Sequence, residues 1–249
     1  MSGAGGEADR LAPPVTDDLS AGPNGAGAAP AGKAPPATGN EPAPVGPEGP
    51  PREDHSVPAR QVAFWFLRHG ETDWNARGLS QGNVDIPLNA VGVEQAHRAA
   101  AALRALRGPQ RIATVVASPL GRAQHTARIV AEALDLPFAT DPDLREVSFG
   151  VQEGKPMAEW FDDWVEGRVT PEGAESFPEL RRRTVRAIDR ALALPGPVLV
   201  VAHGALWRAF RQAAGLPANV RTPNALPLWV EPPVGGGRSW RFTPAELGG

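Results

Sequence analysis

Arginine and histidine residues stand directly after two short apolar runs of the chain. The run 61–67 is followed by Arg68 and His69, and the run 198–202 is followed by His203. Neutral imidazole is a nucleophile toward phosphorus, and a guanidinium group offers a planar pair of donors to phosphate oxygens. Together these residues indicate chemistry on a phosphorylated substrate, whereas a single Arg-His-Gly tripeptide more often marks a structural histidine.

The apolar runs predict buried strands, because they are short and lack helical spacing. A third such run lies at 112–117, and helices are predicted at 91–107, 120–134, 157–168, 177–194 and 205–214. Strands that alternate with helices favour an α/β fold, a three-layer α/β/α sandwich with a mostly parallel central sheet. Ligands bind at the carboxyl ends of such strands, so we expect Arg68, His69, Arg122 and His203 to meet at that edge.

Arg122 falls in the first turn of the helix predicted at 120–134. Free N–H groups and the helix dipole favour an anion at a helix N-terminus. We therefore expect an anion site there, to which Arg122 adds its charge. The alternative for a single arginine in a helix is a solvated surface residue.

Three segments outside these elements have weaker patterns. Residues 76–90 contain Gly, Asn and Pro without a sustained period and predict a long loop, which in a compact domain usually has a function. Residues 226–230 and 239–242 predict closing edge strands around a Gly-rich turn.

The composition divides the chain in two. Residues 1–59 are rich in Pro, Gly and Ala and carry eight acidic and three basic residues, a charge of −5. Since the whole chain carries −3, the remainder carries +2. Because few large apolar residues stand in this segment, we predict a disordered tail at 1–59 and one folded domain at 60–249. The domain is not basic enough to indicate nucleic-acid binding.

The sequence also bounds location and redox chemistry. It contains neither a secretory signal nor a run of about 20 apolar residues, so we expect a cytoplasmic protein that does not enter a membrane. The absence of Cys excludes disulfides, zinc-thiolate sites and a cysteine nucleophile. No pattern indicates the oligomeric state.

Four ordered fragments resemble the motifs of the histidine phosphatase superfamily, which has the phosphoglycerate-mutase-like fold. The fragments are Leu67-Arg68-His69-Gly70-Glu71-Thr72 with Trp74-Asn75, Ser118-Pro119-Leu120 with Arg122-Ala123, Leu144-Arg145-Glu146, and Val201-Ala202-His203-Gly204. The ordered set is far more specific than any one fragment, and the resemblance covers about 61–230.

The resemblance implies a role for each site residue. His69 is the expected nucleophile that becomes phosphohistidine, and Glu146 is the expected acid that protonates the leaving oxygen. The resemblance assigns the remaining binding roles to Arg68, Arg122 and His203 around the phosphoryl oxygens, and to Asn75, Gln81, Gly82 and Gly204 along the same pocket. Fixed cationic donors stabilise the transferring group without a metal, so no metal and no cofactor are expected. Beside that group a carboxyl can keep its proton, because nearby anionic charge opposes its ionisation.

Hydrolysis of a small phosphorylated metabolite is the favoured activity, and two alternatives remain. Cofactor-dependent mutases resemble one another in a long insertion between the acid and the second histidine. In this chain Glu146 and His203 are only 57 positions apart. That spacing leaves room for a small cap at 157–168, in which Trp160 and Trp164 face either the substrate or the core. A catalytically silent phospho-ligand-binding protein is disfavoured because the catalytic set is intact. A metal site is disfavoured because two arginines would repel a cation.

Overall fold

A six-stranded mixed sheet forms the centre of the fold. The computed structural model describes residues 58–235 and 239–246, so the tail predicted at 1–59 lies almost entirely outside the described residues. The strands are β1 (Phe64–Arg68), β2 (Thr114–Ala117), β3 (Phe138–Thr140), β4 (Val198–Ala202), β5 (Pro227–Glu231) and β6 (Arg241–Pro244). Their order is β3-β2-β4-β1-β5-β6. The pairs among the first four strands are parallel, and β5 pairs antiparallel with β1 and β6.

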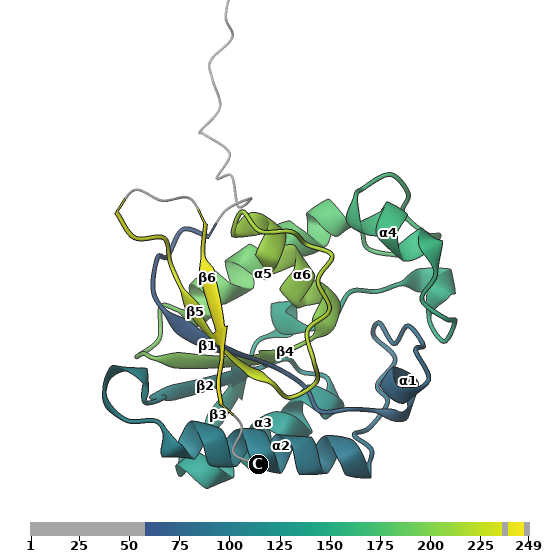
Figure 1. Cartoon of the computed structure of the whole chain (residues 1–249). Helices are drawn as coiled ribbons and strands as arrows, with labels where there is room; N and C mark the ends of the chain where they lie inside the picture. Colours follow the sequence, from purple (N-terminus) through teal and green to yellow (C-terminus); the bar gives the residue numbers. More distant parts are fainter. Residues whose placement is uncertain (1–57, 236–238, 247–249) are drawn as a thin grey trace, which may run out of the picture. The chain divides into compact units, whose positions relative to one another are not determined.

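Two helical layers cover the two faces of the sheet (Figure 1). The helices are α1 (Asp73–Ala76), α2 (Ala90–Ala105), α3 (Gly121–Leu134), α4 (Glu159–Val165), α5 (Phe177–Ala191) and α6 (Gly204–Ala213), with 3₁₀ turns at Gly108–Gln110, Pro142–Leu144 and Gly150–Gln152. Side chains alternate across a strand, so Trp65 and Leu67 of β1 pack with α2 and α3, whereas Phe64 and Phe66 pack with α5 and α6. The predicted three-layer sandwich is therefore confirmed.

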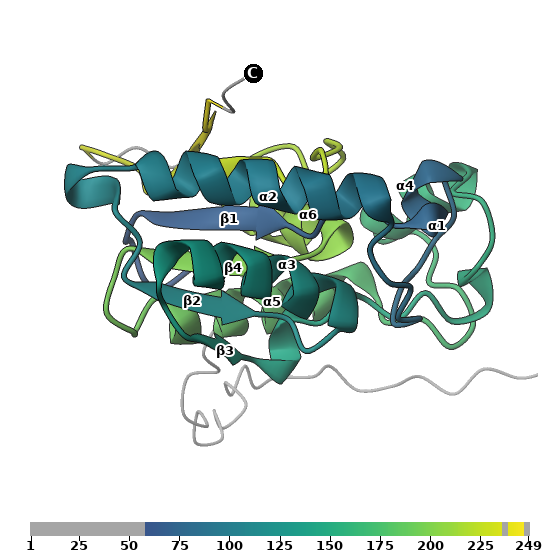
Figure 2. The same ribbon diagram turned by 90° about the horizontal axis from the view of Figure 1, so that it is seen from below.

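The carboxyl ends of β1, β4 and β2 lie next to one another at one edge of the sheet. Arg68 of β1 pairs with Ala202 of β4, and Ala117 of β2 pairs with Val201 of β4. Figure 2 shows α1 and α4 beyond this same edge, at the end to which β1 and β2 point. The edge is thus the place where the loops, the cap and the predicted site residues can meet.

The strand predictions needed two corrections. The strand β5 is not an edge strand, because it lies between β1 and β6. The strand β3, which is the real edge on the other side, had no sequence signal, because Phe138-Ala139-Thr140 is short and largely exposed. Among the helices of the described residues, none has both the length and the apolar character that a membrane span needs.

Candidate active site

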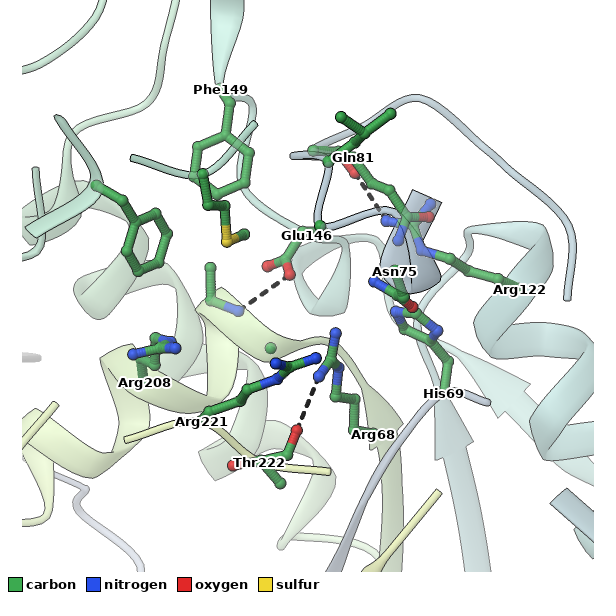
Figure 3. Close-up of a pocket in the computed structure, with 17 residues that line it drawn as sticks. Arg68, His69, Asn75, Gln81, Arg122, Glu146, Phe149, Arg208, Arg221 and Thr222 are labelled. Atoms are coloured by element: carbon green, nitrogen blue, oxygen red, sulfur yellow. Dashed lines mark hydrogen bonds between the residues drawn. The ribbon is translucent and has the colours of Figure 1, made fainter. Parts of the chain in front are cut away.

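A cavity of about 260 Å³ opens at the carboxyl edge of the sheet. Figure 3 shows the side chains that surround it. Eight of the nine predicted site residues line this cavity, namely Arg68, His69, Asn75, Gln81, Gly82, Arg122, Glu146 and Gly204. They come from segments more than a hundred positions apart, which the parallel strands bring together. His203 is the one predicted residue that does not line the cavity.

His69 is buried and held in one tautomer. Its Nδ1 lies 2.7 Å from the carbonyl oxygen of Gly70, and a carbonyl can only accept, so Nδ1 carries the proton. The lone pair on Nε2 is then left for reaction. Burial, reinforced by the charges of Arg122 and Arg68, lowers the pKa of His69 well below 6.5. His69 is therefore neutral at physiological pH, which is the form that a nucleophile needs.

The backbone around His69 is fixed by contacts from three elements. The His69 N–H donates to Ala202 of β4, and the Gly70 N–H donates to Thr126 of α3. Gly70 packs directly on the start of α2, where an added Cβ would lie 2.3 Å from the Gly92 oxygen. Only glycine fits at position 70, so His69 is placed by the packing of the sheet against α2 and α3.

Arg68 lies beside His69 with its guanidinium group directed into the cavity (Figure 3). Its Nη1 donates to the carbonyl oxygen of Thr222 over 2.7 Å. Burial lowers the pKa of Arg68 to about 10; the charge of Glu146 opposes this shift, and the neighbouring arginines each add a smaller lowering. Arg68 stays charged at neutral pH, and its other nitrogens can bind a phosphoryl oxygen.

Arg122 is only 1% exposed, and its side chain binds the loop that contains Gly82 and Val84. Its Nη1 and Nη2 donate to the carbonyl oxygens of Val84 and Gly82 over 2.8 and 2.7 Å. Asp85 of the same loop accepts from the Gly121 N–H over 2.6 Å at the start of α3. The expectation of an open anion site at this helix N-terminus was wrong, because a carboxylate of the chain itself occupies it. Arg122 is also not a surface residue.

Glu146 is 7% exposed and sits on the first turn of α6. Its Oε2 accepts from the Ala205 N–H, and its Oε1 accepts from the N–H groups of Leu206 and Val147, over 3.0 to 3.1 Å. Both oxygens accept backbone donors at a helix N-terminus, which is the arrangement of an ionised carboxylate. Arginines, rather than anions, surround it in the unliganded cavity.

His203 lies next to His69 and is not among the residues that line the cavity. Its ring centroid is 5.2 Å from that of His69, and its Nε2 lies 2.6 Å from the Ser118 hydroxyl oxygen. The side chain is 0% exposed, and burial lowers the pKa of His203 well below 6.5. In the described part of the chain, no group of three or more His, Asp or Glu side chains, His203 included, could hold a metal ion.

Asn75 and Gln81 present amide groups to the cavity. The Oδ1 of Asn75 accepts from Thr72 in the capping box of α1 and from Asn224, which also donates to the carbonyl oxygen of His69 over 3.0 Å. The amide NH₂ of Asn75 is thereby left for a ligand. Asn224 thus positions two site residues, and sequence reasoning missed it because it lies in an irregular segment after α6.

A comparison with protein families decides the assignment of this site. Residues 64–224 match the family described as the histidine phosphatase superfamily (branch 1), which is well over half of the chain. The chain belongs to this superfamily. A curated relative from Yersinia pestis (strain Pestoides F), named probable phosphoglycerate mutase GpmB, is 42% identical over 171 residues, which cover 64% of this chain and 77% of the relative.

Solved structures of histidine phosphatases have the same fold. The alpha-ribazole phosphatase from Shigella flexneri has a TM-score of 0.60 and 27% identity, over 74% of this chain and 96% of that one. A mycobacterial glucosyl-3-phosphoglycerate phosphatase in complex with VO₃ has a TM-score of 0.59 and 29% identity, over 73% and 96%. The resemblance seen in the four sequence fragments is confirmed.

Neither tryptophan of the cap lines the cavity. Met157 and Phe161 of the cap line it, together with Phe149. Trp164 is fully buried, packs in one cluster with residues of α5 and α6, and donates to the Glu175 carbonyl oxygen. Trp160 packs on the edge of Phe149 outside the cavity lining. Trp164 therefore anchors the cap, and Trp160 supports a residue of the cavity wall.

Two further cavity residues, Arg208 and Arg221, were missed. The expected site contained only two arginines, Arg68 and Arg122. Arg208 belongs to α6, four residues after the end of the fourth motif, and Arg221 belongs to the segment before β5, which carried no recognised motif. Arg208 faces the cavity because it stands one helical turn after Gly204, which also lines the cavity.

The buried histidines predict a loss of stability on mild acidification. His69 and His203 stay neutral in the folded state, because their pKa values are lowered well below 6.5 by burial and by arginine charges. The unfolded chain binds protons near pH 6.5, so below that pH the free energy of unfolding should fall by up to about 1.4 kcal/mol per pH unit for each histidine. Above that pH the contribution of both histidines is fully present.

Denaturant unfolding of the wild type and of His203→Asn, from about pH 7.5 to about pH 5.5, checks this slope. The variant should have a shallower pH dependence, whatever its absolute stability. His97 is exposed on α2, so His97→Gln is the matched control and should keep the wild-type slope. An equal slope in all three proteins would mean that the buried histidines do not cause it.

Proposed function

We propose that this protein is a metal-independent phosphatase that hydrolyses a phosphomonoester of a small metabolite, with His69 as the nucleophile. The observation that carries the proposal is a neutral His69, held in the Nδ1–H tautomer, on the wall of an arginine-lined cavity. The cavity volume of about 260 Å³ suits a small ligand. The proposal places the activity in residues 60–249.

The first step transfers the phosphoryl group to the protein. The lone pair of His69 Nε2 attacks phosphorus, the bond between phosphorus and the ester oxygen breaks, and the oxygen leaves with a proton from Glu146. Arg68 and Arg122 stay charged and bind the equatorial oxygens as negative charge spreads over them. The resemblance assigns His203 to the phosphoryl oxygens as well; because its side chain lies next to His69 and outside the cavity lining, its part in this step is to support His69.

The proton on Glu146 has a source in the substrate. In the unliganded cavity the Glu146 carboxylate accepts three backbone N–H groups, so the acid form has to be made when the ester binds. A phosphomonoester has a second pKa of about 6 and can arrive as a monoanion that passes its proton to Glu146. In the second step Glu146, again ionised, accepts a proton from the water that attacks phosphohistidine, and phosphate leaves.

A mutase is the second candidate, because the curated relative from Yersinia pestis carries that name. A mutase returns the phosphoryl group from His69 to a hydroxyl of the bound product, whereas a phosphatase passes it to water. A panel of phosphorylated small metabolites incubated with the purified protein and followed by ³¹P NMR separates the two. We expect inorganic phosphate as the product. An isomeric phosphomonoester as the main product would contradict hydrolysis.

Activity should not depend on a divalent ion. Arg68 and Arg122 supply the positive charge that Mg²⁺ supplies in many phosphoryl-transfer enzymes, so removal of metals should leave the rate within about twofold of its original value. Initial rates on p-nitrophenyl phosphate before and after dialysis against EDTA provide the measurement. Loss of activity that is restored by added Mg²⁺, Mn²⁺ or Zn²⁺ would show that a metal takes part.

A further inference from the structure

The cavity is lined by more arginines than the phosphoryl group engages. Four arginines line it, Arg68, Arg122, Arg208 and Arg221, and Glu146 is the one carboxylate among the lining residues. Outside the lining, Asp85 forms an ion pair with Arg122 over 3.6 Å. Within residues 58–235 and 239–246, the side chains of Arg68, Arg208 and Arg221 form no ion pair.

Arg208 is held rigidly at the far side of the cavity from the nucleophile. Its guanidinium group lies over the ring of Phe161, 5.0 Å from the centroid, and it donates to the side chain of Asn219. Asn219 is in turn anchored to Asp162 over 2.6 Å. Figure 3 shows Arg208 well separated from His69 and Arg122. Arg208 is therefore fixed in position but too far from the phosphoryl site to serve it.

Arg221 is the cavity arginine whose side chain is not engaged by the described part of the chain. Within residues 58–235 and 239–246, no hydrogen bond or ion pair involves its side chain, although it lines the cavity. It stands next to Thr222, whose carbonyl oxygen binds Arg68, and Figure 3 shows its guanidinium group beside that of Arg68. The charge of Arg221 acts on Arg68 to lower its pKa, so the two groups repel each other in the unliganded cavity.

We propose that Arg208 and Arg221 bind a second anionic group of the substrate, a carboxylate or a second phosphate, while Arg68 and Arg122 bind the phosphoryl group that is transferred. This proposal rests on the proposed phosphatase function and narrows its substrate class to phosphomonoesters that carry a further negative charge. The second anion would give Arg221 a charged partner and relieve the repulsion between Arg221 and Arg68. The aromatic face of Phe161 keeps Arg208 aimed at that group.

Matched substrates test this in the wild-type protein. In 3-phosphoglycerate a carboxylate replaces the CH₂OH group of glycerol 3-phosphate, and propane-1,3-diol bisphosphate adds a second phosphate to the corresponding monophosphate. Hydrogen bonds to charged groups predict that, in one pair, the member with the second anionic group has a kcat/KM roughly tenfold to a hundredfold higher. The pair that shows the preference identifies the second group. Equal values in both pairs would overturn the proposal.

Variants assign the preference to the two arginines. In Arg221→Gln and in Arg208→Gln, the ratio of kcat/KM between the members of the preferred pair should fall roughly tenfold, because the second anion loses a charged donor. Arg211→Gln is the control, because this substitution removes the same charge from the same helix as Arg208→Gln does. Its guanidinium lies over Phe242, and its Nε donates to the Pro217 carbonyl oxygen, outside the cavity lining. Its ratio should equal that of the wild type.

The outcomes separate the two proposals. Turnover of simple phosphomonoesters with no preference for a second anion would overturn the substrate class and leave the phosphatase function standing. A preference that persists in both Arg208→Gln and Arg221→Gln would overturn the assignment to these residues. If no phosphomonoester is turned over, the phosphatase function is wrong and the substrate class that rests on it is wrong with it.

Discussion

His69→Ala should abolish turnover of every phosphomonoester. The change removes the Nε2 lone pair, and no other nucleophile among the described residues stands in its place on the cavity wall. His203 is the nearest imidazole, but its Nε2 is engaged with Ser118 and its side chain does not line the cavity. The rate should fall by at least about 10⁴-fold, and to a similar extent with good and poor leaving groups, because the bond to phosphorus can no longer form.

The measurement is kcat/KM on p-nitrophenyl phosphate and on an alkyl phosphate. His125→Ala is the matched control, because His125 is exposed on α3 and its loss should leave both values unchanged. Thermal unfolding of His69→Ala checks that the sheet edge is intact. A folded His69→Ala protein that keeps more than about a tenth of the wild-type activity would contradict the nucleophile assignment.

Glu146→Gln should slow hydrolysis of an alkyl phosphate by roughly 10²–10⁴-fold, the usual contribution of a positioned general acid. An alkoxide leaves poorly without a proton, whereas p-nitrophenolate is a stable anion that hardly needs one. The penalty should therefore shrink markedly on p-nitrophenyl phosphate. Equal penalties on both substrates, with chemistry rate-limiting, would show that another group protonates the leaving oxygen.

The comparison of leaving groups is needed because Glu146→Gln also disturbs the cavity. Both oxygens of Glu146 accept backbone N–H groups, so the amide NH₂ of glutamine must face a donor and one hydrogen bond is lost. That loss costs about 1–3 kcal/mol and affects both substrates alike. Glu153→Gln is the control, because Glu153 accepts from Asn83 and Phe149 through Oε1 alone and does not line the cavity. It should show no dependence on the leaving group.

The sequence predicted the elements that local patterns determine. The buried strands β1, β2 and β4 are short apolar runs on both faces, and their parallel order explains why Arg68, His69 and Arg122 converge. Their convergence follows from topology alone, since parallel strands share one carboxyl edge. The resemblance then supplied Glu146 and the amide residues, which lie in irregular segments without a pattern of their own.

The features that the sequence did not predict depend on contacts between distant segments. Asp85 occupies the N-terminus of α3 although it lies 36 positions before Gly121. Arg221 reaches the cavity only because the segment after α6 returns across Arg68 to pair β5 with β1. The charge pattern and the helix propensity of the sequence predict neither contact, because each contact depends on how a loop closes in three dimensions. Arg221 was missed for that reason.

Hydrolysis through His69 requires a covalent phosphoryl group on this residue, and trapping that group is the direct test. Rapid acid-free quenching with base during turnover of a ³²P-labelled substrate preserves phosphohistidine, and trypsin releases residues 69–77 by cleavage after Arg68 and Arg77. We predict a base-stable, acid-labile phosphoryl group on His69 that forms and decays at rates able to support turnover. Phosphate released in a single turnover without any labelled protein, or label on His203 or another residue in place of His69, would contradict the account.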